Sequence, residues 1–542
     1  MIKKIVYGIC LVLLAALFLS PQVYLYLIPK LADFQSVLTN ENTIKAVKNT
    51  LIVSFAVGVL CLALGLPLAW LLTRTNLPFK KFFRSGFCLP YAIPPFVGAI
   101  GWIILANPTS GVLNQWLGLN LNIYSYTGLI WVETSFLFTF VLLTALTVLD
   151  SMDSSLEEAA RLSGASGLRV FIDIALPLLR PAILSGFLLS FLATAASFGV
   201  PALVGGPARI YLMTTQIYTY QRMGTATGLQ MSIAVSVILG ITTLVLLYGT
   251  QLLFSASKNY TVGGKTARPS LVPLNAWKTP VTVILAILLF IIFILPLSGV
   301  LLSALSSVQG SWSLSGLTLN NFERVLFQTE ETARALRQSL LLGFGAAIIC
   351  TAFAFIFNYF MYRTRWWGKN IASVIASLPF STPGTVLALA FILSFSQGFF
   401  GVGPSLYNTL FLILLAYIVK YMSLSIKTVG DGYQQIHPSL EEAARISGAS
   451  WWTIMYTIYM PLLKTALIAS MFLVFMPVLS ELTMTILLTG PGLETIGTLI
   501  FSLQEYSDMG GGGASVLSVI VVVFILLLNF GLKVLSKGRY GL

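Results

Sequence analysis

The sequence contains few charged residues. Only 9% of its 542 residues are Asp, Glu, Lys or Arg, whereas 57% are hydrophobic. Soluble proteins keep about a quarter of their residues charged in order to stay solvated. So low a charge density leaves too little polar surface to face water on every side. The composition therefore predicts that most of the chain lies in lipid.

Residues that bind metals or form disulfides are also scarce. His437 is the only histidine, which excludes a histidine-based metal cluster. The four cysteines have no CxxC spacing and lie in or beside apolar runs, so we expect small buried side chains rather than disulfides or ligands. They are Cys10, Cys61, Cys88 and Cys350. We predict no catalytic residue, no metal site and no cofactor.

Long apolar runs define the predicted architecture. A membrane-spanning helix needs about 20 mainly apolar residues, and spanning strands would alternate apolar with polar residues, which these runs do not. We therefore predict an all-α, multi-pass membrane protein with about twelve spanning helices. In numerical order they are 5–28, 48–72, 87–106, 128–149, 181–204, 229–254, 280–304, 338–361, 372–396, 407–428, 464–488 and 514–535.

The basic residues indicate an orientation in the membrane. Loops that face the cytoplasm carry an excess of Lys and Arg. With the N-terminus inside, 23 basic residues fall on the inner side, Lys420 and Lys427 among them, and 8 on the outer side. This predicts that both termini lie in the cytoplasm. The cations are spread over short loops rather than clustered on one soluble face, so nucleic acid is not an expected partner.

The chain also repeats itself. Residues 156–166 and 440–450 share ten of eleven residues at an offset of 284, and Arg74-Thr75 matches Arg363-Thr364 at an offset of 289. Six predicted spans separate the copies, so the halves have the same orientation and form parallel repeats. We predict a first half at 1–254, a cytoplasmic linker at 255–279 and a second half at 280–542.

The repeated loops share one local pattern. Ser155 with Glu158, and Ser439 with Glu442, fit a capping box at the start of a short helix. Small residues follow, then a glycine that ends or bends the helix, then a proline before the next span. The residues are Ala159, Ala160, Gly164 and Pro177 in the first loop, and Ala443, Ala444, Gly448 and Pro461 in the second. One such loop could simply shape the membrane surface. Two copies favour a partner with two-fold symmetry.

This spacing resembles the signature loop of permease subunits in type I ATP-binding-cassette importers. The first copy matches from Glu158 to Pro177, and the second departs only at Met460, where leucine is usual. The resemblance implies a fused two-half permease of the bacterial inner membrane, whose loops bind two copies of a separate ATPase. It also implies alternating access to a solute delivered by a binding protein on the outer face. The linker contains no complete phosphate-binding loop, in keeping with a separate ATPase chain.

Two other classes of membrane protein are alternatives to an importer permease. A membrane enzyme would need an intramembrane cluster of acids or metal ligands, and only Glu133 and Glu481 lie in or near spans. Glu481 is a candidate pathway residue, or else a carboxylate that satisfies neighbouring helices, and its first-half equivalent is Ser197, so its role would not be duplicated. An ion-gradient-driven secondary transporter also shows parallel repeats, without this loop motif.

The transported solute is the least determined property. The fused halves and the stretch 197–207 resemble ferric-iron permeases. The same pattern occurs in permeases for an organophosphonate, a sugar phosphate or another small solute, and these remain alternatives. We expect ferric iron, with specificity set by the binding protein.

Overall fold

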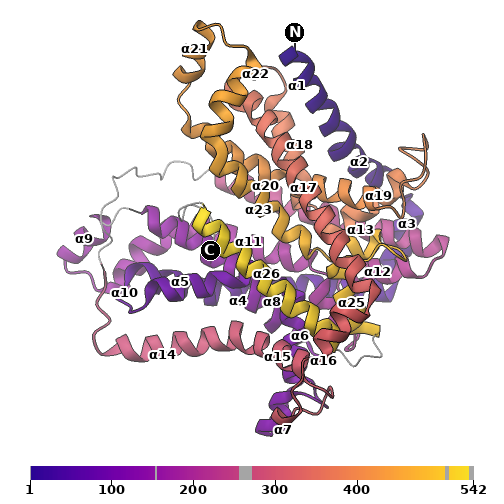
Figure 1. Cartoon of the computed structure of the whole chain (residues 1–542). Coiled ribbons are helices and arrows are strands. Elements are labelled where there is room, and N and C mark those ends of the chain that lie inside the picture. Colours follow the sequence, from indigo (N-terminus) through magenta and orange to yellow (C-terminus); the bar gives the residue numbers. More distant parts are fainter. Residues whose placement is uncertain (1, 153–154, 256–270, 507–511, 536–542) are drawn as a thin grey trace.

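The computed structural model describes residues 2–152, 155–255, 271–506 and 512–535. Within these ranges the chain forms helices and no strand (Figure 1). Ten helices of this described part are long and apolar enough to cross a membrane, or up to twelve if each of two bent pairs is one span. The predicted all-α, multi-pass class is confirmed. Most of the predicted linker, at 256–270, lies outside the described residues.

The first half contains thirteen α-helices in the described ranges. In chain order they are α1 Ile2–Leu13, α2 Ser20–Leu27, α3 Leu31–Thr39, α4 Glu41–Arg74, α5 Lys80–Cys88, α6 Pro95–Ala106, α7 Val112–Leu117, α8 Tyr126–Ser151, α9 Ser155–Leu162, α10 Gly167–Val170, α11 Leu176–Ala196, α12 Met213–Arg222 and α13 Ala226–Ser255. A 3₁₀ turn occupies Leu89–Tyr91, and π-helical turns occupy Leu14–Leu19, Phe171–Ala175 and Pro201–Gly205.

The second half contains another thirteen in the described ranges. They are α14 Lys278–Leu289, α15 Leu295–Leu305, α16 Asn320–Glu323, α17 Glu330–Arg363, α18 Lys369–Ser381, α19 Gly384–Phe395, α20 Leu410–Gln435, α21 Ser439–Ile446, α22 Trp451–Ile454, α23 Met460–Leu479, α24 Thr485–Leu488, α25 Ile496–Tyr506 and α26 Gly512–Leu535. Here 3₁₀ turns occupy Asn275–Trp277 and Leu314–Gly316, and π-helical turns occupy Phe290–Ile294, Arg324–Gln328 and Met455–Tyr459.

The two halves repeat each other in structure as well as in sequence. Helices α4 and α17 have the same bounds at an offset of 289, and α8 and α20 at 284. Corresponding hydrogen bonds also recur. The Met213 amide donates to the Thr50 hydroxyl at 2.8 Å, and the Ile496 amide donates to the Ser339 hydroxyl at 2.8 Å. Each bond joins the start of a short helix, α12 or α25, to the long helix α4 or α17.

The predicted spans at 87–106 and 372–396 are not continuous helices. Each is a pair of helices, α5 with α6 bent by 98°, and α18 with α19 bent by 110°. The bends fall at Pro94 and Pro383, whose backbone is extended. Proline has no amide hydrogen to donate to the preceding turn, so the helix breaks where the apolar run continues. Hydrophobicity alone did not reveal these breaks.

Two other predicted spans end earlier than expected. The spans at 181–204 and 464–488 correspond to α11 and α23, which stop at Ala196 and Leu479. Glu481 was predicted inside a span and instead follows the end of its helix. The chain then turns into α12 and α25, two short helices that sequence analysis missed because they carry polar residues.

Lys420 was counted as a cytoplasmic loop residue, and this assignment is wrong. It lies in the middle of α20, one of the helices long and apolar enough to span. Its ammonium group donates to the Phe380 carbonyl at 3.2 Å and to the Thr382 carbonyl. These carbonyls are available because α18 ends at Ser381, beside the bend. Removing Lys420 from the count leaves a clear excess of basic residues on the inner side.

The first helices of each half pack on the opposite half. Helices α1 and α2 lie along α17, α18 and α19, while α14 and α15 lie along α5 and α6 (Figure 1). The Tyr7 hydroxyl donates to the Trp367 carbonyl at 2.8 Å. A side chain at Gly101 would meet the Pro296 carbonyl oxygen at 2.2 Å, so glycine permits α6 and α15 to cross closely. The halves are therefore interlocked.

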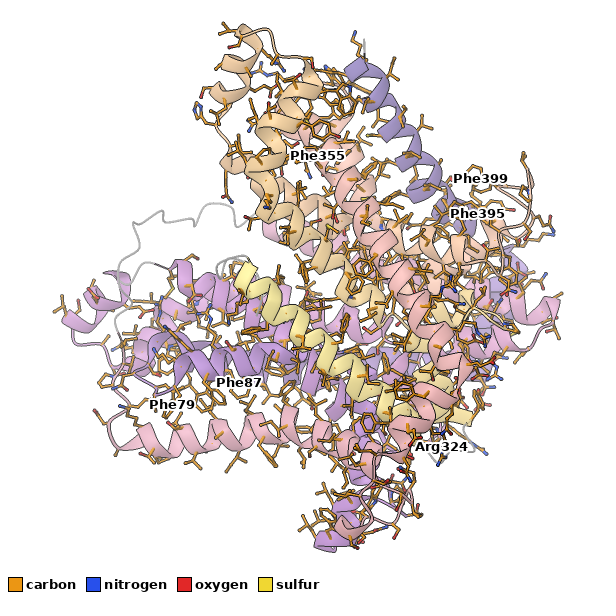
Figure 2. All side chains as sticks on the ribbon, in the orientation of Figure 1. Phe79, Phe87, Arg324, Phe355, Phe395 and Phe399 are labelled. Carbon is orange, nitrogen blue, oxygen red and sulfur yellow. The ribbon has the colours of Figure 1, made fainter. Side chains whose placement is uncertain are left out.

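Helices α4, α8 and α11 pack together as a first bundle, and α17, α20 and α23 pack together as a second. Each bundle has an aromatic interior. Phe87 packs against Phe138 in the first, with ring centroids 6.3 Å apart, and Phe355 packs against Tyr433 in the second, at 6.3 Å. Figure 2 shows Phe87 and Phe355 in the two separate bundles. The four cysteines are buried and free, as predicted. Their burial in apolar surroundings accounts for them without a chemical role.

Candidate functional site

The two repeated loops, called here the coupling segments, run from 155 to 177 and from 439 to 461. Each starts with a short helix, α9 or α21, and these helices lie at the far ends of two bundles that diverge in Figure 1. Gly164 and Gly448 follow the helices with φ of +83° and +79°, a conformation that favours glycine. The predicted helix breaks at these glycines are confirmed.

The motif residues form matching exposed surfaces. Glu158 and Glu442 are exposed, Ala159 and Ala443 are exposed, and Ala160 and Ala444 are half-buried. A side chain built at Gly164 or Gly448 would meet no atom within 4 Å. Pro177 and Pro461 lie in the first turns of α11 and α23, where a missing amide hydrogen is tolerated. Substitution at these alanines would therefore alter a surface, whereas at the two glycines it would also strain a backbone with positive φ.

Each of these surfaces also carries an exposed apolar residue that was not predicted from the sequence. Leu162 is 89% exposed at the end of α9, and Ile446 is 88% exposed at the end of α21. They are equivalent at the offset of 284. The signal was present in the sequence, since an apolar residue follows the arginine in both copies of the motif. Both segments thus leave an apolar side chain open at the equivalent position.

The predicted capping box is wrong in the second segment. Helix α21 begins at Ser439 itself, with Pro438 at the N-cap and no side-chain cap. The Ser439 hydroxyl is instead 2.8 Å from Nδ1 of His437, and that nitrogen accepts from the Ser439 amide at 3.3 Å. The histidine side chain thus takes up a free amide of the first turn. The corresponding cap of α9 involves 153–154, which lie outside the described residues.

In each coupling segment, the glutamate immediately before the motif glutamate is buried. Glu157 is 2% exposed and Glu441 is 5% exposed. Arg74 Nε lies 3.0 Å from a carboxylate oxygen of Glu157, with both side chains almost fully buried. Burying charge is tolerated when it is paired. Glu157 therefore joins α9 to the end of α4, and the sequence did not distinguish it from Glu158.

Glu441 is held by a different set of groups. It accepts hydrogen bonds from the hydroxyls of Tyr359 at 2.8 Å and Tyr459 at 2.5 Å, and it pairs with Arg445. Burial raises the pKa of Glu441, but the two hydroxyls and Arg445 outweigh this, so its pKa lies below the usual value. The carboxylate therefore stays charged and anchors α21 to α17 and to the turn before α23.

An equivalent arginine in each half binds the end of the helix that leads into the coupling segment. Arg74 donates to the carbonyl oxygens of Leu149 at 2.9 Å and Met152 at 3.4 Å, at the end of α8. Arg363 donates to those of Tyr433 at 3.0 Å and Ile436 at 2.5 Å, at the end of α20. A cation suits the carbonyls at a helix C-terminus. Each arginine thus fixes the direction in which the chain enters its coupling segment.

A cavity of about 330 Å³ lies between the halves, and it brings together both predicted pathway residues. Ser197 lines it from the first half and Glu481 from the second. Glu481 accepts bonds at 2.9 Å from the amides of Met484 and Thr485, and also from the Thr485 hydroxyl. The bonds lie within the break after α23 rather than across helices. We call this the central cavity.

A second cavity, of about 530 Å³, is lined mainly by α12 and α25 and the residues beside them. Three tyrosines line it, Tyr124, Tyr211 and Tyr218, together with Arg222 and Glu505. The Arg222 guanidinium lies 5.6 Å from the ring centre of Tyr218 and also contacts the Tyr506 hydroxyl. The lining combines these polar groups with apolar side chains such as Leu203 and Phe501, a mixture typical of sites that contact a solute.

Duplicated spanning bundles with a repeated loop in each half define a class, the fused two-half membrane permeases. The family described as "Binding-protein-dependent transport system inner membrane component" matches this chain over residues 62–255 and again over 339–539. The chain belongs to that family. Each match contains one coupling segment, so each half carries its own match to the family.

Relatives include permeases of one or two halves. The putative ferric transport system permease protein FbpB 1 of Haemophilus influenzae is 26% identical, over 83% of this chain and 71% of the relative. FbpB of Actinobacillus pleuropneumoniae is 25% identical, over 90% and 71%. The putative 2-aminoethylphosphonate transport system permease protein PhnV of Salmonella paratyphi A is 30% identical, over 47% and 93%. These relatives are transport permeases rather than enzymes.

Proposed function

We propose that this chain is the complete translocation pathway of an ATP-driven importer, with one docking surface for an ATPase subunit on each coupling segment. The observation that carries this proposal is the pair of equivalent exposed surfaces, each with small residues and an open apolar side chain, Leu162 or Ile446. Two surfaces on one chain require two ATPase copies. Their placement at the ends of separate bundles would let closure of the ATPase pair bring the bundles together.

The test of this proposal is to enlarge or charge each surface. Gly164→Glu and Ala160→Arg alter the first segment, and Gly448→Glu and Ala444→Arg alter the second. Because the docking surface depends on close approach, we expect normal insertion with weakened ATPase binding and loss of transport. Co-purification of the ATPase and solute-stimulated ATP hydrolysis in membranes measure these effects. Variants altered in both segments that still bind the ATPase and couple its hydrolysis to uptake would contradict the proposal.

Orientation forms part of the proposal, because the ATPase acts in the cytoplasm. The excess of basic residues on the inner side supports cytoplasmic termini and cytoplasmic coupling segments. In a chain whose own cysteines are replaced, single cysteines at Asn114 and Gly403 should be labelled from outside the cell. A cysteine at Glu158 should not be labelled. Outside labelling at Glu158 would reverse the orientation and remove the basis for ATPase docking.

Ferric iron is the solute that we propose, delivered by a binding protein at the outer face. Relatives named as ferric permeases match over most of this chain, and this supports the choice. The matching phosphonate permease supports a second candidate, an organophosphonate. A deletion strain should lose growth on limiting iron and recover with the wild-type chain. A growth defect confined to 2-aminoethylphosphonate as the phosphorus source would favour the second candidate.

A further inference from the structure

The central cavity shows an exchange of residues between the halves. At the offset of 284, Glu133 on α8 is equivalent to Tyr417 on α20, and Ser197 is equivalent to Glu481. Each half thus places one carboxyl and one hydroxyl at the same two positions, in opposite order. A carboxylate is therefore present in both halves, although on different elements. The expectation that Glu481 has no acidic counterpart followed from comparing single positions.

The two carboxyl groups differ in how well they are satisfied. Glu481 accepts three hydrogen bonds. Glu133 lines the same cavity and is fully buried, yet among the described residues neither of its carboxylate oxygens has a hydrogen-bond partner. The hydroxyl of Ser197 lies nearby. A buried carboxyl without partners costs several kcal/mol, so its presence calls for a functional explanation.

The oxygen groups of the lining suit a hard cation. Lys420 on α20 interacts electrostatically with Glu481 and offsets part of the negative charge of that carboxylate. The remaining polar groups of the lining include the hydroxyls of Tyr91, Tyr421 and Ser197. The lining thus offers two carboxyl groups and several hydroxyl oxygens, and carboxylate and hydroxyl oxygens are the ligands that hard cations prefer.

We propose that the central cavity is a transient binding site for a hard, oxygen-preferring cation, with Glu133 of the first half and Glu481 of the second as its ligands. This inference rests on the proposed function, since a transit site matters only in an importer, and it narrows the solute to a cation. The described residues contain no group of three or more His, Cys, Asp or Glu that could hold a metal ion. Two carboxyl groups therefore suit passage rather than storage.

The division of ligands between halves links binding to conformation. Glu133 is closed off from solvent in this structure. When the halves move against each other, the two carboxyl groups move with different bundles, so their separation changes. A cation bound by both would be held in one state and released in the other. Only such a difference in affinity between states lets a ligand bias the change.

Terbium(III) is a suitable probe, because it is a hard trivalent cation and its luminescence is excited through nearby aromatic rings. Tyr91 and Tyr421 line the cavity. We expect Glu133→Gln to weaken Tb³⁺ binding to the purified full-length chain about tenfold or more, and Glu481→Gln to weaken it less, because Glu481 already serves the break after α23. Glu331→Gln, an exposed carboxylate on α17, is the matched control and should bind like wild type.

Unchanged Tb³⁺ affinity in both Glu133→Gln and Glu481→Gln would overturn the inference. Should Glu133→Gln fail to fold, Glu133→Met removes the carboxyl group and keeps a side chain of similar length that needs no hydrogen bond. Wild-type affinity in that variant would be the contrary result. Uptake of radioactive Fe³⁺ by cells separates this inference from the proposed function. If both variants take up iron as fast as wild type does, the cation site is contradicted and the importer function stands. Tb³⁺ binding through Glu133 without iron uptake leaves the cation site and removes iron as the solute.

Discussion

The two coupling segments share ten of eleven motif residues and yet are anchored by different contacts. In the first segment, Glu157 forms a buried ion pair with Arg74. In the second, Glu441 is bound by Tyr359, Tyr459 and Arg445. Among the described residues no ion pair joins Arg363 to Glu441. The outward surfaces are equivalent, whereas the inward attachments are not.

This comparison separates docking from attachment. Residues that face outward are matched because each surface must fit the same kind of partner. The inward glutamate needs only a partner that neutralises or hydrogen-bonds it, and different neighbouring helices provide different partners. Trp70 of the first half is replaced by Tyr359 in the second, at the offset of 289, so only the second half offers a hydroxyl there. We therefore expect the two segments to differ in stability more than in docking.

The largest expected difference concerns the two arginines. Arg74→Met removes a buried ion-pair partner as well as contacts to the end of α8, and should cost about 3–5 kcal/mol of stability. Arg363→Met removes the carbonyl contacts and a ring contact with Tyr459, and should cost about 1–3 kcal/mol. Thermal unfolding of the purified chain in detergent measures both. Equal losses of stability in the two variants would show that the ion pair between Arg74 and Glu157 adds no stability beyond the carbonyl contacts that both arginines make.

The acid behaviour of Glu441 gives a second contrast. Glu441→Gln should cost about 1.5–3 kcal/mol near neutral pH, because two buried hydroxyls lose a charged acceptor. Since its folded-state pKa is depressed, this stability is present above the unfolded pKa of about 4.3 and is lost as pH falls through the folded value. Unfolding curves of wild type and variant should therefore converge only when the pH lies below the depressed folded-state pKa of Glu441. A difference that persists unchanged in acid would exclude the charge as its source.

The smallest effect should come from the N-terminal helix. Lys3 donates to the Tyr359 hydroxyl at 2.9 Å and lies 5.3 Å from the centre of that ring. Because this contact is half-exposed, Lys3→Met should cost about 0.5–1 kcal/mol. Lys4→Met, an exposed neighbour, is the control and should have no effect. If Lys3→Met destabilised the second segment as much as Glu441→Gln does, α1 would be a principal support of that segment.

Sequence reasoning was most successful where structure is local. Apolar runs become helices because backbone groups in lipid must bond within their own segment. The repeat, the coupling segments and the breaks at Gly164 and Gly448 were likewise readable, since each depends on neighbouring residues. The breaks after α11 and α23 were not, because the apolar run there continues past Ala196 and Leu479. The chain there leaves the helix for contacts with α4 and α17.

By itself, the sequence determined the class of the protein: a duplicated, helical membrane chain with one coupling segment in each half. Only the tertiary structure decided which of two adjacent glutamates is buried, because Glu157 and Glu158 differ solely in the face of α9 that they occupy and in what lies beneath it. It also decided that Glu133 and Glu481, nearly 350 residues apart in the chain, line one cavity. Hydropathy and motif spacing report on local neighbours, whereas ion pairs, helix crossings and shared cavities are formed by segments that meet only when the chain has folded.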